Sequence, residues 1–144
     1  MAVDVFSTKQ SDLERLFEII NEPSVLEQMP LPKPVTLDRV RKWHAGAAQT
    51  GLLLFSIKTN KKIIGCINFT REGKLSIWLS AEFQRKGLGS QALALAEQHA
   101  RAECLSRLWL ECKRTNVAGQ AFFEKNSFVL TGEKKGLLVY EKKL

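Results

Sequence analysis

The sequence predicts an α+β protein in which helices cover both faces of a mixed, mostly antiparallel sheet. Three observations lead to this class. Apolar residues recur at helical spacing in the first third of the chain, three short apolar segments separated by polar turns follow, and a strand–helix–strand pattern comes next. The expected order of elements is βααβββαβαββ. We expect residues 1–144 to form a single domain, because 144 residues is an ordinary length for one domain.

The first part of the chain predicts one short strand and two helices. Residues 3–7 (VDVFS) form the strand. The segment SDLE begins a helix with Ser11 as its N-cap and the glutamate three residues later reaching back, and Pro23 ends or bends this helix. A stiff, proline-rich loop follows at residues 29–36, and Thr36 caps the second helix.

The central part predicts a meander of three strands. Residues 52–58, 63–70 and 75–80 are rich in apolar side chains and are joined by the polar turns TNKK and REGK. Such short connections join antiparallel neighbours, because parallel strands need a long crossover.

The last third predicts a βαβ unit, one more helix and a hairpin. Residues 90–103 form an amphipathic helix and residues 107–112 a buried strand, so the strands on either side of the helix are expected to run parallel. A helix at residues 117–125 follows, with Asn116 as its N-cap and Asn126 as its left-handed C-cap. The closing hairpin pairs residues 128–131 with residues 136–141.

Composition narrows the function classes. The chain is 44% hydrophobic and 26% charged, and it has no apolar run of the roughly 20 residues that a membrane span needs, nor an apolar leader at its start. Its three cysteines form no CxxC pair, so we expect a reduced, cytoplasmic protein without a structural metal site. The net charge of +7 favours either simple solubility or a polyanionic ligand. No nucleic-acid-binding motif is present, so we expect no nucleic-acid partner.

The turn from Gln84 to Gly89 (QRKGLG) carries the clearest chemical signal. It precedes the helix at residues 90–103, and the free amides at a helix N-terminus attract anions. Its glycines allow a ligand to approach the backbone, and Arg85 and Lys86 add positive charge. The turn therefore suits a pyrophosphate, although a basic turn with glycines for backbone geometry alone would look the same.

Two other phosphate-binding motifs do not fit. The P-loop pattern GxxxxGK followed by Ser or Thr is absent. GLGSQA does match the dinucleotide pattern GxGxxA, and Glu111 follows at about the distance of a ribose contact. However, Gly87 is the seventh residue after the third strand, where the dinucleotide fold uses a tight turn, and three antiparallel strands precede it. The surroundings therefore argue against a dinucleotide fold.

Two longer stretches carry a family resemblance. LSAEFQRKGLGSQALALAEQHA resembles motif A of the GNAT family of N-acetyltransferases, and LWLECKRTNVAGQAFFEKNSF resembles the later strand and helix of the same family. NEPSVLEQMPLPKPVTLDRVRKW is also similar to this group, and the motif texture is closest to the ribosomal-protein-alanine type. The resemblance covers nearly the whole chain in order. It implies the acyl-CoA N-acyltransferase fold.

The resemblance also implies ligands and the residues that bind them. The donor would be acetyl-CoA, and the second substrate a primary amine that attacks the thioester directly in a ternary complex. The pyrophosphate would bind Gln84, Arg85, Lys86, Gly87, Leu88, Gly89 and Ser90. The pantetheine arm would pair like an added strand with Leu79, Ser80 and Ala81, where the third strand splays from its neighbour. Asn116 would contact the cofactor, cap a helix, or do both.

For catalysis, the resemblance implies a base and a proton donor for the thiolate. Glu111 matches a position where relatives carry a base, and Glu72 is a weaker alternative. Phe123 would contact the cofactor at the position where relatives usually carry a tyrosine, but it has no proton to give. The hydroxyl of Ser80 or Ser90, or water, is the expected substitute, and the default role of the only tyrosine, Tyr140, is structural.

Several alternatives stay open from the sequence. Phe123 leaves room for a non-catalytic module that binds acyl-CoA. The acceptor site is expected between the first two helices, the proline-rich loop and the last hairpin, and many relatives form homodimers. Cys66 and Cys112 are expected to be core residues, and His44 to be solvated or packed near the acceptor region.

Overall fold

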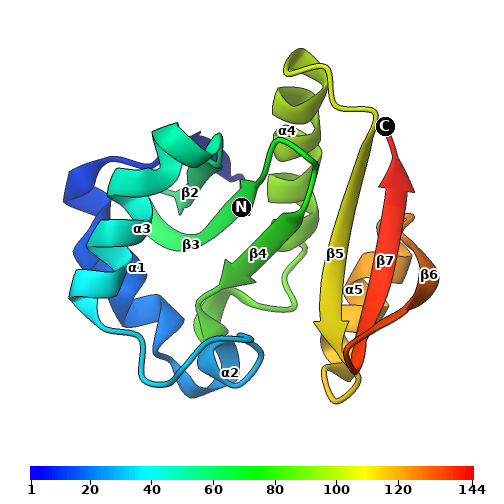
Figure 1. The fold of residues 1–144 in the computed structure, drawn as a ribbon. Coiled ribbons are helices and arrows are strands. Elements are labelled where there is room, and N and C mark those ends of the chain that lie inside the picture. Colours follow the sequence, from blue (N-terminus) through cyan, green and yellow to red (C-terminus); the bar gives the residue numbers. More distant parts are fainter.

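The computed structural model describes residues 1–144, which form helices on both sides of two β-sheets (Figure 1). The helices are α1 (Leu13–Ile20), α2 (Pro23–Leu26), α3 (Leu37–Thr50), α4 (Leu88–Ala102) and α5 (Val117–Lys125), with single 3-10 turns at Gln10–Asp12 and Ala81–Phe83. The strands are β1 (Asp4–Ser7), β2 (Leu53–Thr59), β3 (Lys62–Phe69), β4 (Leu75–Leu79), β5 (Arg107–Lys113), β6 (Val129–Lys134) and β7 (Leu137–Lys143). No helix is long and apolar enough to cross a membrane.

The predicted single sheet is divided into two. One sheet has the antiparallel order β1-β2-β3-β4, and the other has the antiparallel order β5-β7-β6. The strands β4 and β5 run parallel, as predicted, but they meet only at the bridge between Lys74 and Trp109. There the Trp109 N–H donates to the Gly73 carbonyl at 2.9 Å, and beyond this point the strands diverge (Figure 1).

The four-stranded sheet separates two apolar cores. On one face α4 packs with β2, β3 and β4, and this core continues to β5 and β7. On the other face α1 and α3 cover residues that include Cys66 and Trp78. Cys66 and Cys112 are both buried, as predicted. Each face of the four-stranded sheet is therefore covered by its own core, and β4 forms the edge of this sheet next to β5.

Two helix caps lie where the sequence predicts them. The Thr36 Oγ1 atom accepts a hydrogen bond from the backbone N–H of Arg39 at 3.2 Å, and Asn116 Oδ1 accepts one from Gly119 at 2.9 Å. The position of α5 agrees with its predicted bounds. In contrast, α4 begins two residues earlier than predicted, directly after Gly87, whose φ is +78°.

One predicted cap is wrong and another is right only in its position. Ser11 lies inside the 3-10 turn, and the carboxylate of Asp12 instead accepts the Lys9 N–H at 2.9 Å. Asn126 is the C-cap of α5 as predicted, but its φ of −95° is not left-handed, and Ser127 takes that conformation with a φ of +72°. The amide of Asn126 instead donates to the Phe122 carbonyl at 2.8 Å. Pro23 also does not end α1, since it is the first residue of α2.

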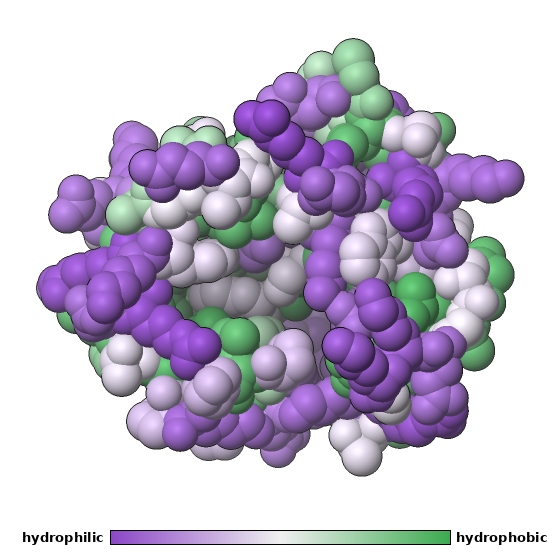
Figure 2. All heavy atoms as spheres, in the orientation of Figure 1, coloured by the Kyte–Doolittle hydropathy of each residue, from purple (hydrophilic) through white to green (hydrophobic).

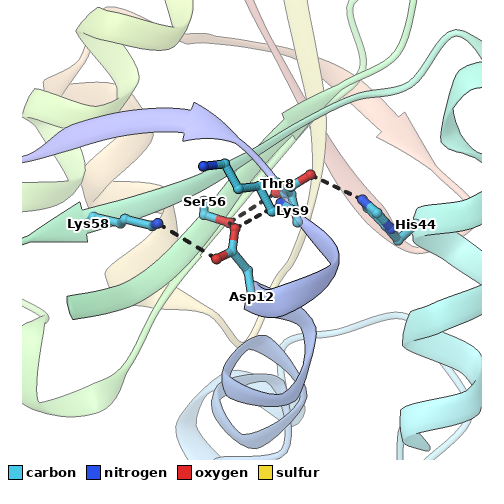
Figure 3. A network of polar contacts seen from close by, with 6 residues as sticks. All are labelled: Thr8, Lys9, Asp12, His44, Ser56 and Lys58. Carbon is cyan, nitrogen blue, oxygen red and sulfur yellow. Dashed lines mark hydrogen bonds and ion pairs between the residues drawn. The ribbon is translucent and has the colours of Figure 1, made fainter. Parts of the chain in front are cut away.

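A polar network fixes the start of α1 (Figure 3). The buried Asp12 carboxylate accepts a hydrogen bond from Ser56 Oγ of β2 at 3.0 Å and lies 3.7 Å from Lys58 Nζ. The Thr8 hydroxyl lies 3.1 Å from Ser56 Oγ, and the Thr8 carbonyl lies 3.1 Å from His44 Nε2 of α3. His44 is therefore part of this network, which joins α1 and α3 to β2.

Candidate active site

The space between β4 and β5 is bordered by backbone groups that their own sheets do not use. The Ser80 N–H donates to the Ile64 carbonyl at 2.7 Å, so in this antiparallel pair Ile77 and Leu79 direct their N–H and C=O groups away from β3, towards β5. The hydrogen bond from the Leu144 N–H to the Ser106 carbonyl likewise places the backbone groups of Glu111 on the β4 side. An extended chain between the strands could pair with both.

A cavity of about 610 Å³ opens at this divergence. It is lined by the end of β4, the turn before α4, one face of α5 and the region of α2. Figure 2 shows this face of the molecule hollowed near its centre. The lining residues are Ser24, Val25, Gln28, Met29, Ile77, Trp78, Leu79, Gln84, Arg85, Gly87, Gly89, Ser90, Asn116, Ala118, Gly119, Ala121, Phe122, Phe123 and Lys125.

The structure brings eight of the predicted donor-binding residues together around this cavity. They are Leu79, Gln84, Arg85, Gly87, Gly89, Ser90, Asn116 and Phe123. Four others lie outside its lining. Lys86 is exposed, with its Nζ 5.9 Å from the centre of the Phe83 ring. The side chain of Leu88 belongs to the core, so only its backbone could meet a ligand. Ser80 and Ala81 are held by another side chain, described below.

The N-terminus of α4 has the form of an anion site. The first amides of a helix have no partner within it, and here they follow a turn in which Arg85 and Gly87 both have positive φ. A Cβ on Gly87 would meet no atom within 4 Å, whereas a Cβ on Gly89 would lie 3.0 Å from Phe122 Cε1 of α5. The missing side chain of Gly89 therefore allows α5 to pack closely against α4, and Gly87 allows the left-handed backbone of the turn before α4.

Glu22 is a site residue that the sequence did not reveal. Its carboxylate accepts hydrogen bonds from Ser80 Oγ and from the Ala81 N–H, both at 2.8 Å. In addition, Gln84 Nε2 donates to the Leu79 carbonyl at 2.9 Å. The donors of Ser80 and Ala81 are thus already satisfied. The sequence predicted only that Pro23 ends or bends the first helix, and nothing in it linked Glu22 to β4.

Glu111 lies on β5 with its carboxylate paired to a cation. Its Oε1 atom is 2.5 Å from Lys74 Nζ, which also lies 5.3 Å from the centre of the Trp109 ring. Alternate residues of a strand share a face, so Ser76 and Trp78 project from β4 on the same face as Lys74. The carboxylate of Glu111 therefore lies on the side of the space between β4 and β5 that α1 and α3 cover. Glu72 is exposed in a turn and lines neither large cavity.

Phe123 lines the cavity with no hydroxyl close to it. Its ring packs against Phe122 and Phe128, with centroids 5.3 and 5.7 Å away, and lies 6.3 Å from Tyr140. The Tyr140 hydroxyl donates to Glu124 Oε2 at 3.0 Å, and burial together with this carboxylate raises the pKa of Tyr140. Tyr140 is thus a poor proton donor to the cavity and holds a structural position.

The two serines considered as proton donors differ. The Ser80 hydroxyl is buried and donates to Glu22. Ser90 lines the cavity, and its Oγ accepts a hydrogen bond from Asn126 Nδ2 at 3.1 Å, which leaves its own proton free. Ser90 belongs to the first turn of α4, the part of the cavity suited to phosphate.

A second cavity of about 300 Å³ adjoins the first, because Met29 and Trp78 line both. It lies under α1, α3 and the proline-rich loop, against β3 and β4. Its lining residues are Leu16, Ile20, Met29, Leu31, Val35, Arg39, Val40, Trp43, Asn68, Ser76 and Trp78. The two helices and the loop were expected at an acceptor site, but no residue of the last hairpin lines either cavity.

The charges around the cavities have one sign. Arg85 and Lys125 line the first cavity and Arg39 lines the second, whereas no acidic residue lines either. No cluster of three His, Cys, Asp or Glu side chains is placed to hold a metal ion. The first cavity thus combines positive charge, free amides and an extended backbone edge, the features that a long, phosphate-bearing ligand requires.

Sequence and structure comparisons agree with this geometry. The sequence profile described as "Acetyltransferase (GNAT) family" matches residues 13–128, so the chain belongs to the GNAT acetyltransferase family and is an acyltransferase. No curated protein matches the chain by sequence.

Solved structures share the fold at low identity. An acetyltransferase from Salmonella typhimurium that modifies the N-terminal serine of a 50S ribosomal subunit protein is 18% identical, with a TM-score of 0.84 over 100% of this chain and 96% of that one. The aminoglycoside acetyltransferase AAC(6′)-Ib in complex with paromomycin and acetyl-CoA is 17% identical, with a TM-score of 0.88 over 99% and 94% of the two chains. The PaiA N-acetyltransferase of Thermoplasma acidophilum in complex with CoA is 19% identical, with a TM-score of 0.80 over 100% of both.

Proposed function

We propose that this protein transfers the acetyl group of acetyl-CoA to a primary amine by direct attack in a ternary complex. The observation that carries the proposal is that two cavities meet at Met29 and Trp78, beside the point where β4 and β5 diverge. One cavity has the features of a donor site and the other has those of an acceptor site. Because their lining extends from Leu16 to Lys125, residues 1–144 act as one catalytic domain.

In this proposal, the turn before α4 holds the pyrophosphate. The amides from Gln84 to Ser90, including that of Leu88, surround it, and Arg85 and Lys86 add positive charge. The backbone of Ile77 and the N–H of Leu79 pair with the pantetheine arm from one side, and the backbone of Glu111 pairs with it from the other. Ser80 and Ala81 position the end of β4 through Glu22 rather than bind the arm themselves.

Asn116 has a positioning role in the same site. Its side chain caps α5, and α5 forms one wall of the donor cavity. The cap occupies the Asn116 Oδ1 atom, so its Nδ2 atom is the group that could contact the donor. We include Asn116 in the donor site on this basis.

The chemistry requires the ammonium nitrogen to lose two protons, one before it attacks and one as the amide forms, and the CoA thiolate to gain one, so that one proton is released to solvent overall. Glu111 lines neither cavity, so in this proposal it takes the first proton from the ammonium through water, and the free amine then attacks the thioester carbonyl. A C–N bond forms, the C–S bond breaks, and the CoA thiolate leaves. Phe123 offers no proton, so water protonates the thiolate in this chain.

A thiol-release assay tests the proposal. Acetyl-CoA is mixed with the protein and single amines, free CoA is measured by its reaction with a disulfide reagent, and the acetylated product is identified by mass. We expect release that depends on both protein and amine. Acetyl-CoA binding without transfer to any amine would instead indicate a non-catalytic module that binds acyl-CoA. Sedimentation of the same protein would show whether it forms a homodimer.

A further inference from the structure

We propose, resting on the function above, that the acceptor is a small amine with one positive charge, an apolar body and one uncharged hydrogen-bonding group. Polyamines and aminoglycosides would then be poor substrates. Three properties of the second cavity support this inference: its apolar walls, its polar floor and its positive charge.

The walls of the second cavity are apolar. Leu16 and Ile20 of α1, Val40 and Trp43 of α3, and Trp78 of β4 face it. Its volume of about 300 Å³ lies at the lower end of the range of roughly 300–1,000 Å³ that is usual for small-molecule sites. Walls of this kind favour an aromatic or branched aliphatic body.

The floor of this cavity is polar and is formed by Asn68 and Ser76. Asn68 of β3 is only 8% exposed, yet its one side-chain hydrogen bond is a weak contact from Nδ2 to Cys66 Sγ at 3.7 Å. Ser76 lies directly opposite Asn68 on β4, and both side chains line the cavity. The amide oxygen of Asn68 accepts no hydrogen bond within the protein and is not among the fully buried atoms without a partner, so a hydrogen-bond donor on a ligand in the cavity can reach it. A hydroxyl or amide on the acceptor would supply this donor.

The charge of the cavity disfavours a second ammonium. Arg39 is the only charged residue in the lining, and it forms no ion pair within the protein. A polycation placed here would meet this guanidinium and no carboxylate. The nearest acidic group considered for the reaction, Glu111, is paired with Lys74 and serves the one reacting amine.

The test compares amines by kcat/KM at saturating acetyl-CoA. The apolar monoamines are 2-phenylethylamine and tyramine, which differ by one hydroxyl, and the polycations are spermidine and kanamycin. We expect kcat/KM to be at least tenfold higher for the monoamines, with tyramine the better of the two. In Asn68→Leu the advantage of tyramine should disappear. Gln49→Leu removes an exposed amide outside both cavity linings and serves as the control.

A charge reversal adds a second variant. Arg39 is exposed, so Arg39→Glu should fold, and we expect it to raise kcat/KM for spermidine at least tenfold and to raise that for 2-phenylethylamine, which carries one positive charge, by a smaller factor. Arg41→Glu, an exposed position on the same helix outside the cavity, is the matched control. Binding can be followed without turnover by tryptophan fluorescence, since Trp43 and Trp78 both line the cavity.

The outcomes separate the two proposals. Transfer to spermidine or kanamycin that equals or exceeds transfer to the monoamines would overturn the acceptor class and leave the transferase function standing. Fluorescence changes with the monoamines but without thiol release would support the acceptor cavity and overturn the transfer reaction. Acetyl-CoA binding with neither a fluorescence response nor transfer to any amine would overturn both.

Discussion

Glu22 and Ser80 are 58 residues apart in the chain and are joined by a hydrogen bond of 2.8 Å from the serine hydroxyl to the carboxylate. The second carboxylate oxygen accepts the Ala81 N–H. One side chain therefore fastens the start of α2 to the end of β4. After the other end of α2, the Glu27 carbonyl accepts a hydrogen bond of 2.6 Å from Lys113 Nζ of β5. The short helix thus links the two sheets where they diverge.

Replacement of Glu22 should destabilise the fold. In Glu22→Ala, the buried Ser80 hydroxyl and the exposed Ala81 N–H lose their acceptor, and the buried donor left without a partner costs about 1–3 kcal/mol. We expect a loss of this size in the free energy of unfolding, measured by urea denaturation. Glu18→Ala is the control, because the Glu18 side chain is 63% exposed and makes only a surface pair with Arg15. Equal losses of the free energy of unfolding in the two variants would contradict the role of Glu22 in joining α2 to the end of β4.

The glycines before α4 should decide the affinity for the donor. Gly87→Val forces a branched residue into a left-handed conformation, which costs roughly 1–2 kcal/mol or more. Gly89→Val displaces the Phe122 ring, which would lie 3.0 Å from the new Cβ. We expect the acetyl-CoA dissociation constant, measured by calorimetry, to rise at least about tenfold in each variant. Gly132→Val on the exposed strand β6 should leave it unchanged, and unchanged affinity in the first two variants would refute the proposed phosphate site.

The carboxylate of Glu111 should matter for rate and not for donor binding. If it accepts the proton of the amine, Glu111→Gln lowers kcat by about 10²–10⁴-fold, the usual contribution of general base catalysis. Glu141→Gln is the matched control, since Glu141 lies on the adjacent strand and is also paired with a cation, Arg107. A similar kcat in both variants would show that Glu111 only pairs with Lys74.

A tyrosine at position 123 should speed the reaction. The Phe123 ring already lines the donor cavity, and Phe123→Tyr adds a hydroxyl that can protonate the leaving thiolate. We expect kcat to rise by up to about 10²-fold, the lower end of the contribution of a general acid. Phe122→Tyr, on the neighbouring residue, controls for the added hydroxyl. A kcat that stays constant or falls would mean that protonation of the thiolate does not limit the reaction.

Buried thiols should make the protein less stable in alkali. Burial raises the pKa of Cys66 to about 12 and also raises that of Cys112. The unfolded chain ionises these thiols near pH 9.0, while the folded chain keeps them protonated. Ionisation of the unfolded chain therefore lowers the free energy of unfolding. The contribution of Cys66 to stability is complete below about pH 9 and is lost as the pH rises towards 12.

Two measurements check this expectation. The free energy of unfolding between pH 8 and pH 10.5 should fall less steeply in Cys66→Ala than in the unchanged protein. Some slope should remain, because the raised pKa of Tyr140 acts in the same direction. In the folded protein at pH 8, a thiol reagent should label Cys104, which is exposed, well before Cys66. Equal labelling rates would contradict the burial of Cys66.

Local signals explain most of what the sequence predicted about the fold. Thr36 and Asn116 could be assigned as caps because each stands immediately before a helical pattern and has its partner three residues on. Ser11 and Asp12 are both good caps, so their order along the chain could not decide between them. The βαβ pattern gives the direction of β4 and β5, but how far they pair depends on packing between distant elements.

The residues of the candidate site also fall into those that the sequence could indicate and those that only the fold brings together. The turn from Gln84 to Ser90 is contiguous, so its residue types alone indicated an anion site. Glu22 meets β4 only through the fold, and no spacing rule connects residues 58 positions apart. Asn68 and Ser76 look like ordinary strand residues, and only the register of β3 and β4 places them opposite each other under a cavity.

The seam between β4 and β5, which are joined at a single bridge, has a consequence for the lifetime of the protein. A ligand bound along that seam completes the interior, so it stabilises the folded chain by about 2.7 kcal/mol at a concentration of 100 times its dissociation constant. Without such a ligand, the chain opens more often and exposes more backbone to proteases. Its abundance in a cell would then follow the supply of acyl donor, with no change in its synthesis.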